Sequence, residues 1–210
     1  MLTVRRIINT PVSSNCFVLY DKKISTNCII VDPGSKYNED LLSFLCAQKL
    51  KPDYIILTHE HFDHCWGVNN LVERYNIPII CTDSCIKCIA NDKKNCSVFY
   101  DNSERFSIQS KAISIESINY ELCLNGSIIR FFKTPGHTEA SMSFLSENCL
   151  FTGDALIKGL RTVTKLPTGS QNKQEETVRK FAELQGKGYK VFAGHGEPFL
   201  LDNYDLAFAL

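Results

Sequence analysis

Three of the chain's five histidines lie within one short segment, residues 59–64, which reads His-Glu-His-Phe-Asp-His. A short apolar run typical of a buried strand precedes it. Alternate side chains of an extended segment point to the same side, so His59 and His61 can reach one metal ion together. Asp63 continues that alternation, and a turn there would direct His64 toward a second ion. Clustered imidazoles gain nothing from solvent, and we therefore interpret the segment as metal-binding rather than as an ordinary surface loop.

The other candidate ligands follow three further apolar runs, each next to a glycine. His137 follows residues 128–133, Asp154 follows residues 149–152, and His195 follows residues 189–193. Glycine lets the backbone turn tightly at a strand end, and α/β sandwiches place their chemistry on loops that a rigid sheet holds. A single Gly-His or Gly-Asp pair is weak evidence, whereas four such strand ends in one chain predict a shared metal site.

These motifs resemble those of the metallo-β-lactamase fold superfamily. The resemblance extends from near the N-terminus to Phe199, and within the superfamily it is greatest to the short glyoxalase II-like hydrolases. The motifs that carry it are Val31-Asp32-Pro33-Gly34, Thr58 to His64, Pro135 to Thr138, Gly153-Asp154 and Gly194 to Gly196, with weaker support from Asn15 to Leu19, Gly159 to Arg161 and Leu166 to Ser170.

The resemblance implies a site for two divalent metal ions, expected to be zinc, with iron or manganese as alternatives. The implied ligands are His59, His61 and His137 at the first ion, Asp63, His64 and His195 at the second, and Asp154 as a bridge between the two. Superfamily members that hydrolyse antibiotics commonly carry a cysteine at the second ion. Because every histidine is present here, the pattern is closer to the thioesterase and lactonase branches.

The expected reaction is hydrolysis of a small acyl thioester or a related ester. Zinc lowers the pKa of bound water to about 7, which supplies a nucleophile at neutral pH. Asp63 could orient that water or relay its proton. Lys158 and Arg161 lie where the family often binds a substrate carboxylate, although ordinary solvated charges are equally expected there. Glyoxalase II uses a helical C-terminal extension to hold glutathione; only eleven residues follow Phe199, so we expect weak glutathione binding.

Three alternatives stay open at this point. The first is a persulfide dioxygenase of the same fold with one iron ion, held by two histidines and a further ligand set. The second is a lactonase. The third is a metal-stabilised binding protein without activity, although an intact ligand set disfavours it. Iron content and oxygen uptake would separate the dioxygenase from a hydrolase.

Length and composition limit the remaining possibilities. The 210 residues carry candidate ligands from His59 to His195, which favours one domain over residues 1–210. The formal net charge is zero, so no nucleic-acid or anionic-membrane partner is expected. No apolar run approaches the roughly 20 residues of a membrane helix, and the first residues lack the apolar part of a signal peptide. We expect a cytoplasmic protein with a small-molecule substrate, and the oligomeric state stays open.

The ten cysteines are expected to be reduced thiols, since no export signal accompanies them. Several lie in apolar strand-like runs and are expected to pack as small hydrophobic residues: Cys16, Cys28, Cys81, Cys123 and Cys149. A cluster of four has spacings too irregular for a structural zinc site, and we interpret it as coincidence: Cys81, Cys85, Cys88 and Cys96. The only tryptophan, Trp66, is expected to pack beneath the site, with an aromatic wall for substrate as the alternative.

The order of apolar runs predicts a four-layer αββα sandwich, with two mixed sheets face to face and helices outside. The polar stretch from Ser84 to Ser110 is expected to be irregular. Strands are expected near residues 5–8, 15–20, 28–31, 54–57, 77–82, 112–115, 128–133, 141–145, 149–152 and 190–193, and helices near residues 38–48, 67–75 and 175–185.

Overall fold

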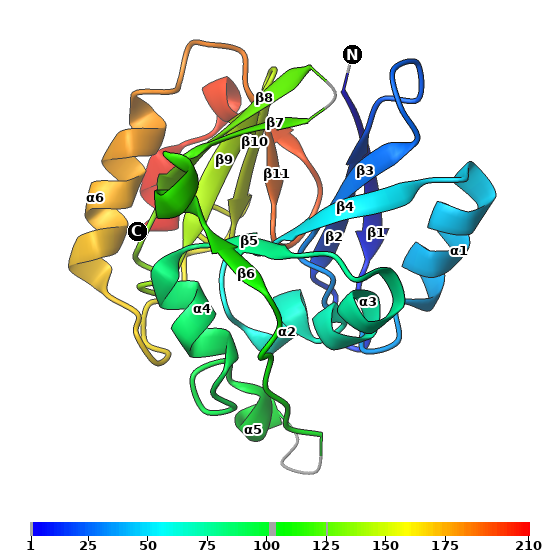
Figure 1. Cartoon of the computed structure of the whole chain (residues 1–210). Coiled ribbons are helices and arrows are strands. Elements are labelled where there is room, and N and C mark those ends of the chain that lie inside the picture. Colours follow the sequence, from blue (N-terminus) through cyan, green and yellow to red (C-terminus); the bar gives the residue numbers. More distant parts are fainter. Residues whose placement is uncertain (1, 101–103, 125) are drawn as a thin grey trace.

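Two six-stranded sheets pack face to face in the computed structural model, which describes residues 2–100, 104–124 and 126–210 (Figure 1). The first sheet contains, in order, β1 (Thr3–Ile8), β2 (Asn15–Tyr20), β3 (Asn27–Val31), β4 (Lys51–Ile56), β5 (Ile79–Cys81) and β6 (Ala112–Ser114). The second contains β12 (Phe199–Leu200), β11 (Lys190–Ala193), β10 (Cys149–Gly153), β9 (Met142–Ser146), β8 (Ser127–Lys133) and β7 (Glu121–Leu124). Both sheets mix parallel and antiparallel pairs, as predicted.

Helices form the outer layers. On the side of the first sheet lie α1 (Glu39–Gln48) and α3 (Val68–Tyr75), and α6 (Gln171–Ala182) covers the outer face of the second sheet (Figure 1). Three shorter helices lie at one end of the sandwich: α2 (Phe62–Cys65), α4 (Asp83–Ile89) and α5 (Ser97–Tyr100). Short 3-10 helices span Ile115–Ile118, Leu201–Asn203 and Leu206–Ala209. The predicted αββα sandwich is confirmed.

The main core lies between the two sheets. The ring of Phe17 in β2 meets the rings of Phe151 and Phe192 in the second sheet edge-on, with ring centres 5.5 Å apart in both pairs. Offset and edge-to-face aromatic contacts of this kind stabilise a core beyond the area that they bury. Every residue of β10 is buried, because the first sheet covers one face of the strand and α6 covers the other.

The structure differs from the prediction in five elements and one side chain. The stretch expected to be irregular contains α4 and α5, and its residues 101–103 lie outside the described part of the chain. The short strands β7 and β12 were not predicted. Helix α6 begins at Gln171 rather than near Glu175. Ser170 caps this earlier start, because its hydroxyl accepts a hydrogen bond from the Lys173 amide. Cys123 is exposed rather than packed, because β7 is an edge strand.

The described residues contain no helix that combines the length and the apolar character needed to cross a membrane.

Candidate metal centre

The histidine-rich segment leaves the end of β4 and enters α2. His61 is still extended, with φ −60° and ψ 145°, and it caps the helix that begins at Phe62. The amide of His64 donates a hydrogen bond to the carbonyl of His61, which closes the first turn. The alternation predicted for Asp63 is therefore wrong, because this residue lies in a helical turn. The turn predicted at this point is present, and it turns Asp63 and His64 toward the same space.

The second sheet contributes the remaining predicted residues. His137 follows β8, Asp154 follows β10, and His195 follows β11. Strands β10 and β11 run parallel, so their carboxyl ends lie at the same edge of the sheet. That edge meets the end of β4 from the first sheet, and side chains from both halves of the chain converge in the space between them.

Among the candidate ligands, the donor atoms form two groups in which all members lie within 4.8 Å of one another, and Asp32 forms a third such group with His59 and His64. The first group is His59, His61 and His137, with His61 Nδ1 and His137 Nε2 only 2.9 Å apart. The second group is Asp63, His64 and His195, and His195 Nε2 lies 3.4 Å from Asp63 Oδ2. These are the two trios that the family resemblance implies.

Asp154 lies against both groups. Its Oδ2 is 3.7 Å from His137 Nε2 and 3.5 Å from His195 Nε2. Its Oδ1 is 3.5 Å from His64 Nε2. The two oxygens of this carboxylate face donor nitrogens of both groups, which is the position that a bridging ligand requires.

The outward-facing nitrogens of four histidines have partners of their own. His64 Nδ1 lies 3.1 Å from Asp32 Oδ2, and His137 Nδ1 lies 2.7 Å from the carbonyl oxygen of Val163. His59 Nδ1 and His195 Nδ1 contact the Thr58 hydroxyl and the Ser13 carbonyl at 3.1 and 3.2 Å. Such partners fix the ring and the tautomer, so that the Nε2 atoms face the centre.

The inner atoms fit metal ions and little else. His59 Nε2, His64 Nε2 and Asp154 Oδ1 are buried without a hydrogen-bond partner. Leaving a buried polar atom unpaired costs about 1–3 kcal/mol. Imidazole and carboxylate are the donors that zinc, iron and manganese accept. The donor set and the unpaired atoms together support a divalent metal site.

The two groups differ in charge. Burial and the neighbouring histidines lower the pKa of His59 well below its ordinary value, and burial lowers the pKa of His61 to about 3. Burial also opposes a charge on His64, but Asp63, Asp154 and Asp32 outweigh it and raise its pKa to about 10. Although burial opposes its ionisation, His64 and His195 hold the pKa of Asp63 below its usual range. A cation at the second group would take the place of the proton that these carboxylates otherwise stabilise on His64.

Three supporting residues were not predicted to have a role in the site: Asp32, Thr58 and Glu60. Asp32 is buried and accepts hydrogen bonds from the amide and hydroxyl of Thr58 at 2.8 and 2.6 Å, in addition to its contact with His64. Asp32 stands in the predicted Asp-Pro-Gly turn, and that motif was the signal that could have identified it. Glu60 is completely buried and accepts hydrogen bonds from the hydroxyls of Thr138 and Thr168.

Two glycines leave room for the site. A Cβ atom on Gly194 would lie 2.1 Å from Asp154 Oδ1 and 2.8 Å from the His64 ring. A Cβ atom on Gly34 would lie 1.6 Å from the carbonyl oxygen of Asp63. At both positions any larger residue must move a candidate ligand.

The predicted substrate-binding residues Lys158 and Arg161 lie on the exposed segment between β10 and α6. Neither forms a hydrogen bond or an ion pair with any residue that the structure describes. Their role in binding stays a prediction.

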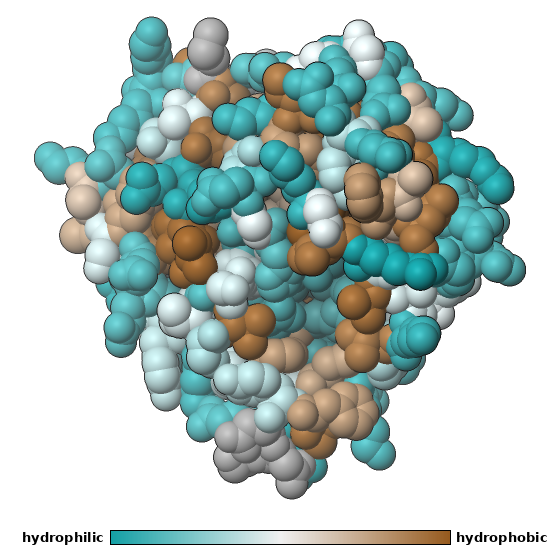
Figure 2. Space-filling model, turned by 180° about the vertical axis from the view of Figure 1, so that it is seen from behind, coloured by the Kyte–Doolittle hydropathy of each residue, from teal (hydrophilic) through white to brown (hydrophobic). Residues whose placement is uncertain are grey.

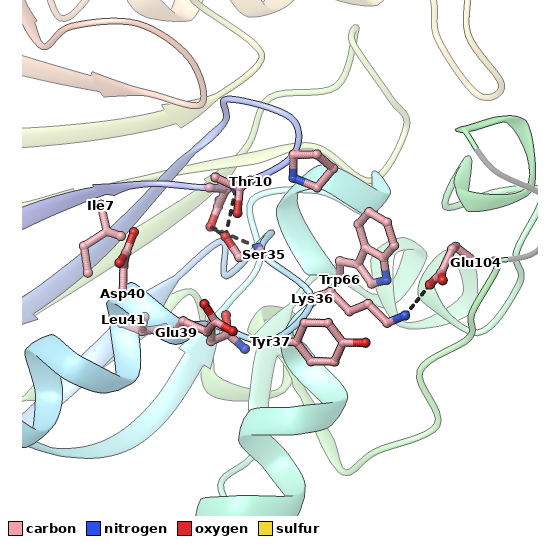
Figure 3. Close-up of a pocket in the computed structure, with 13 residues that line it drawn as sticks. Ile7, Thr10, Ser35, Lys36, Tyr37, Glu39, Asp40, Leu41, Trp66 and Glu104 are labelled. Carbon is pink, nitrogen blue, oxygen red and sulfur yellow. Dashed lines mark hydrogen bonds and ion pairs between the residues drawn. The ribbon is translucent and has the colours of Figure 1, made fainter.

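Trp66 packs against aromatic neighbours. Its ring stacks on Phe106 with a centre distance of 6.1 Å and meets Phe62 and Tyr100 edge-on. Trp66 also lines a cavity of about 400 Å³, where Lys36 extends past Trp66 to pair with Glu104 (Figure 3). Trp66 packs against neighbouring rings, as expected, and it lines the cavity as well.

The four clustered cysteines show no metal site among the described residues, and all ten cysteines are free thiols. Burial raises the pKa of Cys88 and Cys96 to about 11, so these thiols are protonated at neutral pH.

Comparison with known proteins identifies the family. The profile of the metallo-β-lactamase superfamily matches residues 9–85. "Probable metallo-hydrolase MJ0888" from Methanocaldococcus jannaschii is 30% identical over 190 residues, which cover 88% of this chain and 88% of that protein. The chain belongs to the metallo-β-lactamase superfamily. The family assignment and the histidine and aspartate groups support a metal-dependent hydrolase.

A hydroxyacylglutathione hydrolase from Pectobacterium carotovorum is 26% identical over 179 residues. The match covers 85% of this chain and 61% of that protein. Among solved structures, the crystal structure of BLEG-1 B3 metallo-beta-lactamase superimposes with a TM-score of 0.84 and 24% identity, covering 95% of this chain and 94% of that one. That similarity shows the fold.

Proposed function

We propose that the protein hydrolyses a small acyl thioester at a site for two divalent metal ions, most suitably zinc. His59, His61 and His137 would hold one ion, Asp63, His64 and His195 the other, and Asp154 would bridge them. The observation that carries the proposal is the position of Asp154, whose carboxylate lies 3.5 to 3.7 Å from histidines of both groups.

When bound, the metal ions supply Lewis acidity and lower the pKa of bound water to about 7. The protein's own residues position the reactants. Asp63 Oδ2 lies between His64 Nε2 and His195 Nε2, at 3.6 and 3.4 Å, where it can accept a proton from an attacking water. Asp32 and Val163 fix the rings of His64 and His137, so that little reorganisation is needed during the reaction.

The choice of a thioester is supported by the relative named hydroxyacylglutathione hydrolase. The substrate would be a small molecule with an acyl group, and Lys158 and Arg161 would contact any carboxylate that it carries. Lactones are the nearest alternative esters. We propose that glutathione thioesters bind weakly.

Two assays on metal-reconstituted protein test the proposal. One follows hydrolysis of small acyl thioesters and lactones, and the other follows oxygen consumption with glutathione persulfide. We expect thioester hydrolysis that a chelator abolishes and added metal restores. Oxygen uptake without thioester cleavage would replace the hydrolase with the dioxygenase alternative.

Arg161→Ala is the matched variant for carboxylate recognition. We expect it to raise KM more than it lowers kcat, because it removes binding that ground state and transition state share. Lys165→Ala, another exposed cation farther along the same segment, is the control and should leave both constants near their original values.

A further inference from the structure

An apolar groove lies next to the metal centre, and neither the predicted ligands nor the predicted carboxylate-binding residues account for it. Its volume is about 460 Å³. None of the described residues that line it carries a charged side chain. The lining residues are Phe62, Cys96, Phe99, Tyr100, Leu166 and Pro167.

One wall of the groove belongs to the segment with α5. Phe62 stands between the candidate ligands His61 and Asp63, and its amide donates a 2.7 Å hydrogen bond to the Asn95 carbonyl. Its ring stacks on Tyr100 of α5 with a centre distance of 4.7 Å. This wall is therefore tied directly to the metal-binding segment.

The other wall is the loop that holds Leu166 and Pro167. The carbonyl of Val163 accepts the hydrogen bond from His137 Nδ1 at 2.7 Å. The Thr168 hydroxyl donates to buried Glu60 at 3.3 Å. One end of this loop contacts the candidate ligand His137, and the other contacts Glu60, which stands between His59 and His61. The groove therefore opens beside the metal-binding segment rather than at a remote surface.

The groove exposes large apolar side chains to solvent. Phe99 is 69% exposed, Tyr100 45% and Leu166 43%. Brown and pale brown side chains gather around a hollow in the lower half of the molecule in Figure 2, next to the end that bears α5 in Figure 1. Contiguous exposed apolar surface of this kind marks a binding site.

We propose that this groove binds an aliphatic acyl chain of the substrate, which makes the protein selective for acyl thioesters longer than acetyl. The inference rests on the proposed function. The scissile carbonyl would lie at the metal centre, and the chain would extend between α5 and the loop at Leu166. Hydrolysis adds water across the thioester bond, so that the carbon–sulfur bond breaks, a carboxylic acid forms and the leaving sulfur takes a proton.

The apolar side chains that line the groove favour an aliphatic chain over a charged group. A charged group in the groove would lose hydration without gaining an ionic partner from its walls. An aliphatic chain gains with each buried methylene, and the ordinary transfer energy corresponds to about a fourfold rise in kcat/KM per methylene. In the first wall, Cys96, Phe99 and Tyr100 come from the polar stretch between Ser84 and Ser110.

Thioesters of N-acetylcysteamine with acetyl, butyryl, hexanoyl and octanoyl groups provide the kinetic test on metal-reconstituted protein. We expect kcat/KM to rise along the series. Phe99→Ala and Leu166→Ser, one on each wall, should each lower the ratio of octanoyl to acetyl kcat/KM by about tenfold. Phe208→Ala and Leu200→Ser replace apolar residues that do not line the groove, 62% and 50% exposed, and should leave the ratio unchanged.

Calorimetric binding of octanoate and butyrate separates failure of the groove from failure of the proposed function. Tighter binding of octanoate with a negative heat-capacity change, weakened in Phe99→Ala, supports the groove even if no thioester is cleaved. Turnover or binding that does not depend on chain length overturns it. A dimer that dissociates in Phe99→Ala, with chain-length selectivity unchanged, would instead assign the groove to an interface between two copies of the chain.

Discussion

Asp32 shows how single residues outside the ligand set determine the geometry of the site. One of its oxygens contacts His64, and the carboxylate also accepts two hydrogen bonds from Thr58 at the start of the metal-binding segment. It therefore fixes the backbone and a ligand ring together. Partners of metal ligands typically contribute 10- to 100-fold to affinity.

We expect Asp32→Asn to weaken metal binding at the second group by about 10- to 100-fold, since its amide nitrogen cannot accept a hydrogen bond from His64 Nδ1. Metal titration with a competing chelator measures this effect. Asp53→Asn is the control, because Asp53 lies in β4 and pairs with Asn27 rather than with a histidine. Unchanged affinity in Asp32→Asn would show that Asp32 has no role in orienting the ligand.

The lowered pKa of His61 predicts how metal-free protein responds to acid. The unfolded chain takes up a proton at this histidine near pH 6.5, whereas the folded chain does so only near pH 3. Stability therefore falls as the pH drops from about 6.5 toward 3. His64 has the opposite shift, and its contribution is complete below about pH 6.5 and lost as the pH rises toward 10.

Urea unfolding of chelator-treated protein between pH 6 and 4 measures that slope. His61→Gln should reduce it by up to about 1.4 kcal/mol per pH unit, the value for one proton. Phe62→Leu changes the neighbouring residue without a titrating group and should leave the slope unaltered. Equal slopes in His61→Gln and the original protein would contradict a buried neutral histidine.

At the scale of single residues, the candidate ligands were predictable because histidine and aspartate are the residue types that bind metals. All seven lie in the two groups or against them. The roles of Asp32 and Glu60 could not be predicted in the same way, because their partners depend on tertiary packing. Glu60, for example, accepts from Thr138 and Thr168, which are 78 and 108 residues away.

At the scale of whole elements, the ends of the strands position the ligands. The ligand side chains can converge only where the backbone beside them carries no side chain of its own. Gly194 follows β11, where any side chain would meet Asp154 and His64. We expect Gly194→Ala to lower metal-dependent turnover at least 100-fold while the protein still folds, since displacements near 1 Å cost about that factor. Activity and circular dichroism together provide the measurement.

Gly188→Ala controls for the loss of a glycine. Its φ is 74°, and a Cβ atom added there would have no neighbour within 4 Å among the described residues, so the substitution should cost stability without affecting turnover. Comparable activity in Gly194→Ala and Gly188→Ala would contradict the proposed crowding.

The strands with clear apolar runs and the helices with clear periodicity were predictable, whereas β7, β12 and the short helices were not. β12 has two residues and α5 has four, too few for either period to be recognised. Helix α4 starts at a cap in which the Thr82 hydroxyl accepts a hydrogen bond from the Cys85 amide. In a stretch with many polar residues, a single capping threonine is not a distinctive sequence signal. At α2 the turn was predicted, but it begins at Phe62, so Asp63 lies inside the turn rather than in the extended segment.

The whole molecule uses both sheets for a single site. The first sheet carries the segment from His59 to His64, and the second carries His137, Asp154 and His195. Metal binding would therefore connect the two halves of the sandwich and add to its stability. Assignment of residues 1–210 to one domain stays a prediction, as does the cytoplasmic location.

The central claim is that two ions share Asp154, and metal stoichiometry together with anomalous scattering tests it most directly. Protein reconstituted with zinc should contain two ions per chain about 3.5–4 Å apart, both in contact with Asp154. His195→Ala should then reduce the content to one ion, retained by His59, His61 and His137. A single ion at those three histidines in the unaltered protein, with Asp63, His64 and His195 unligated at saturating zinc, would contradict the account.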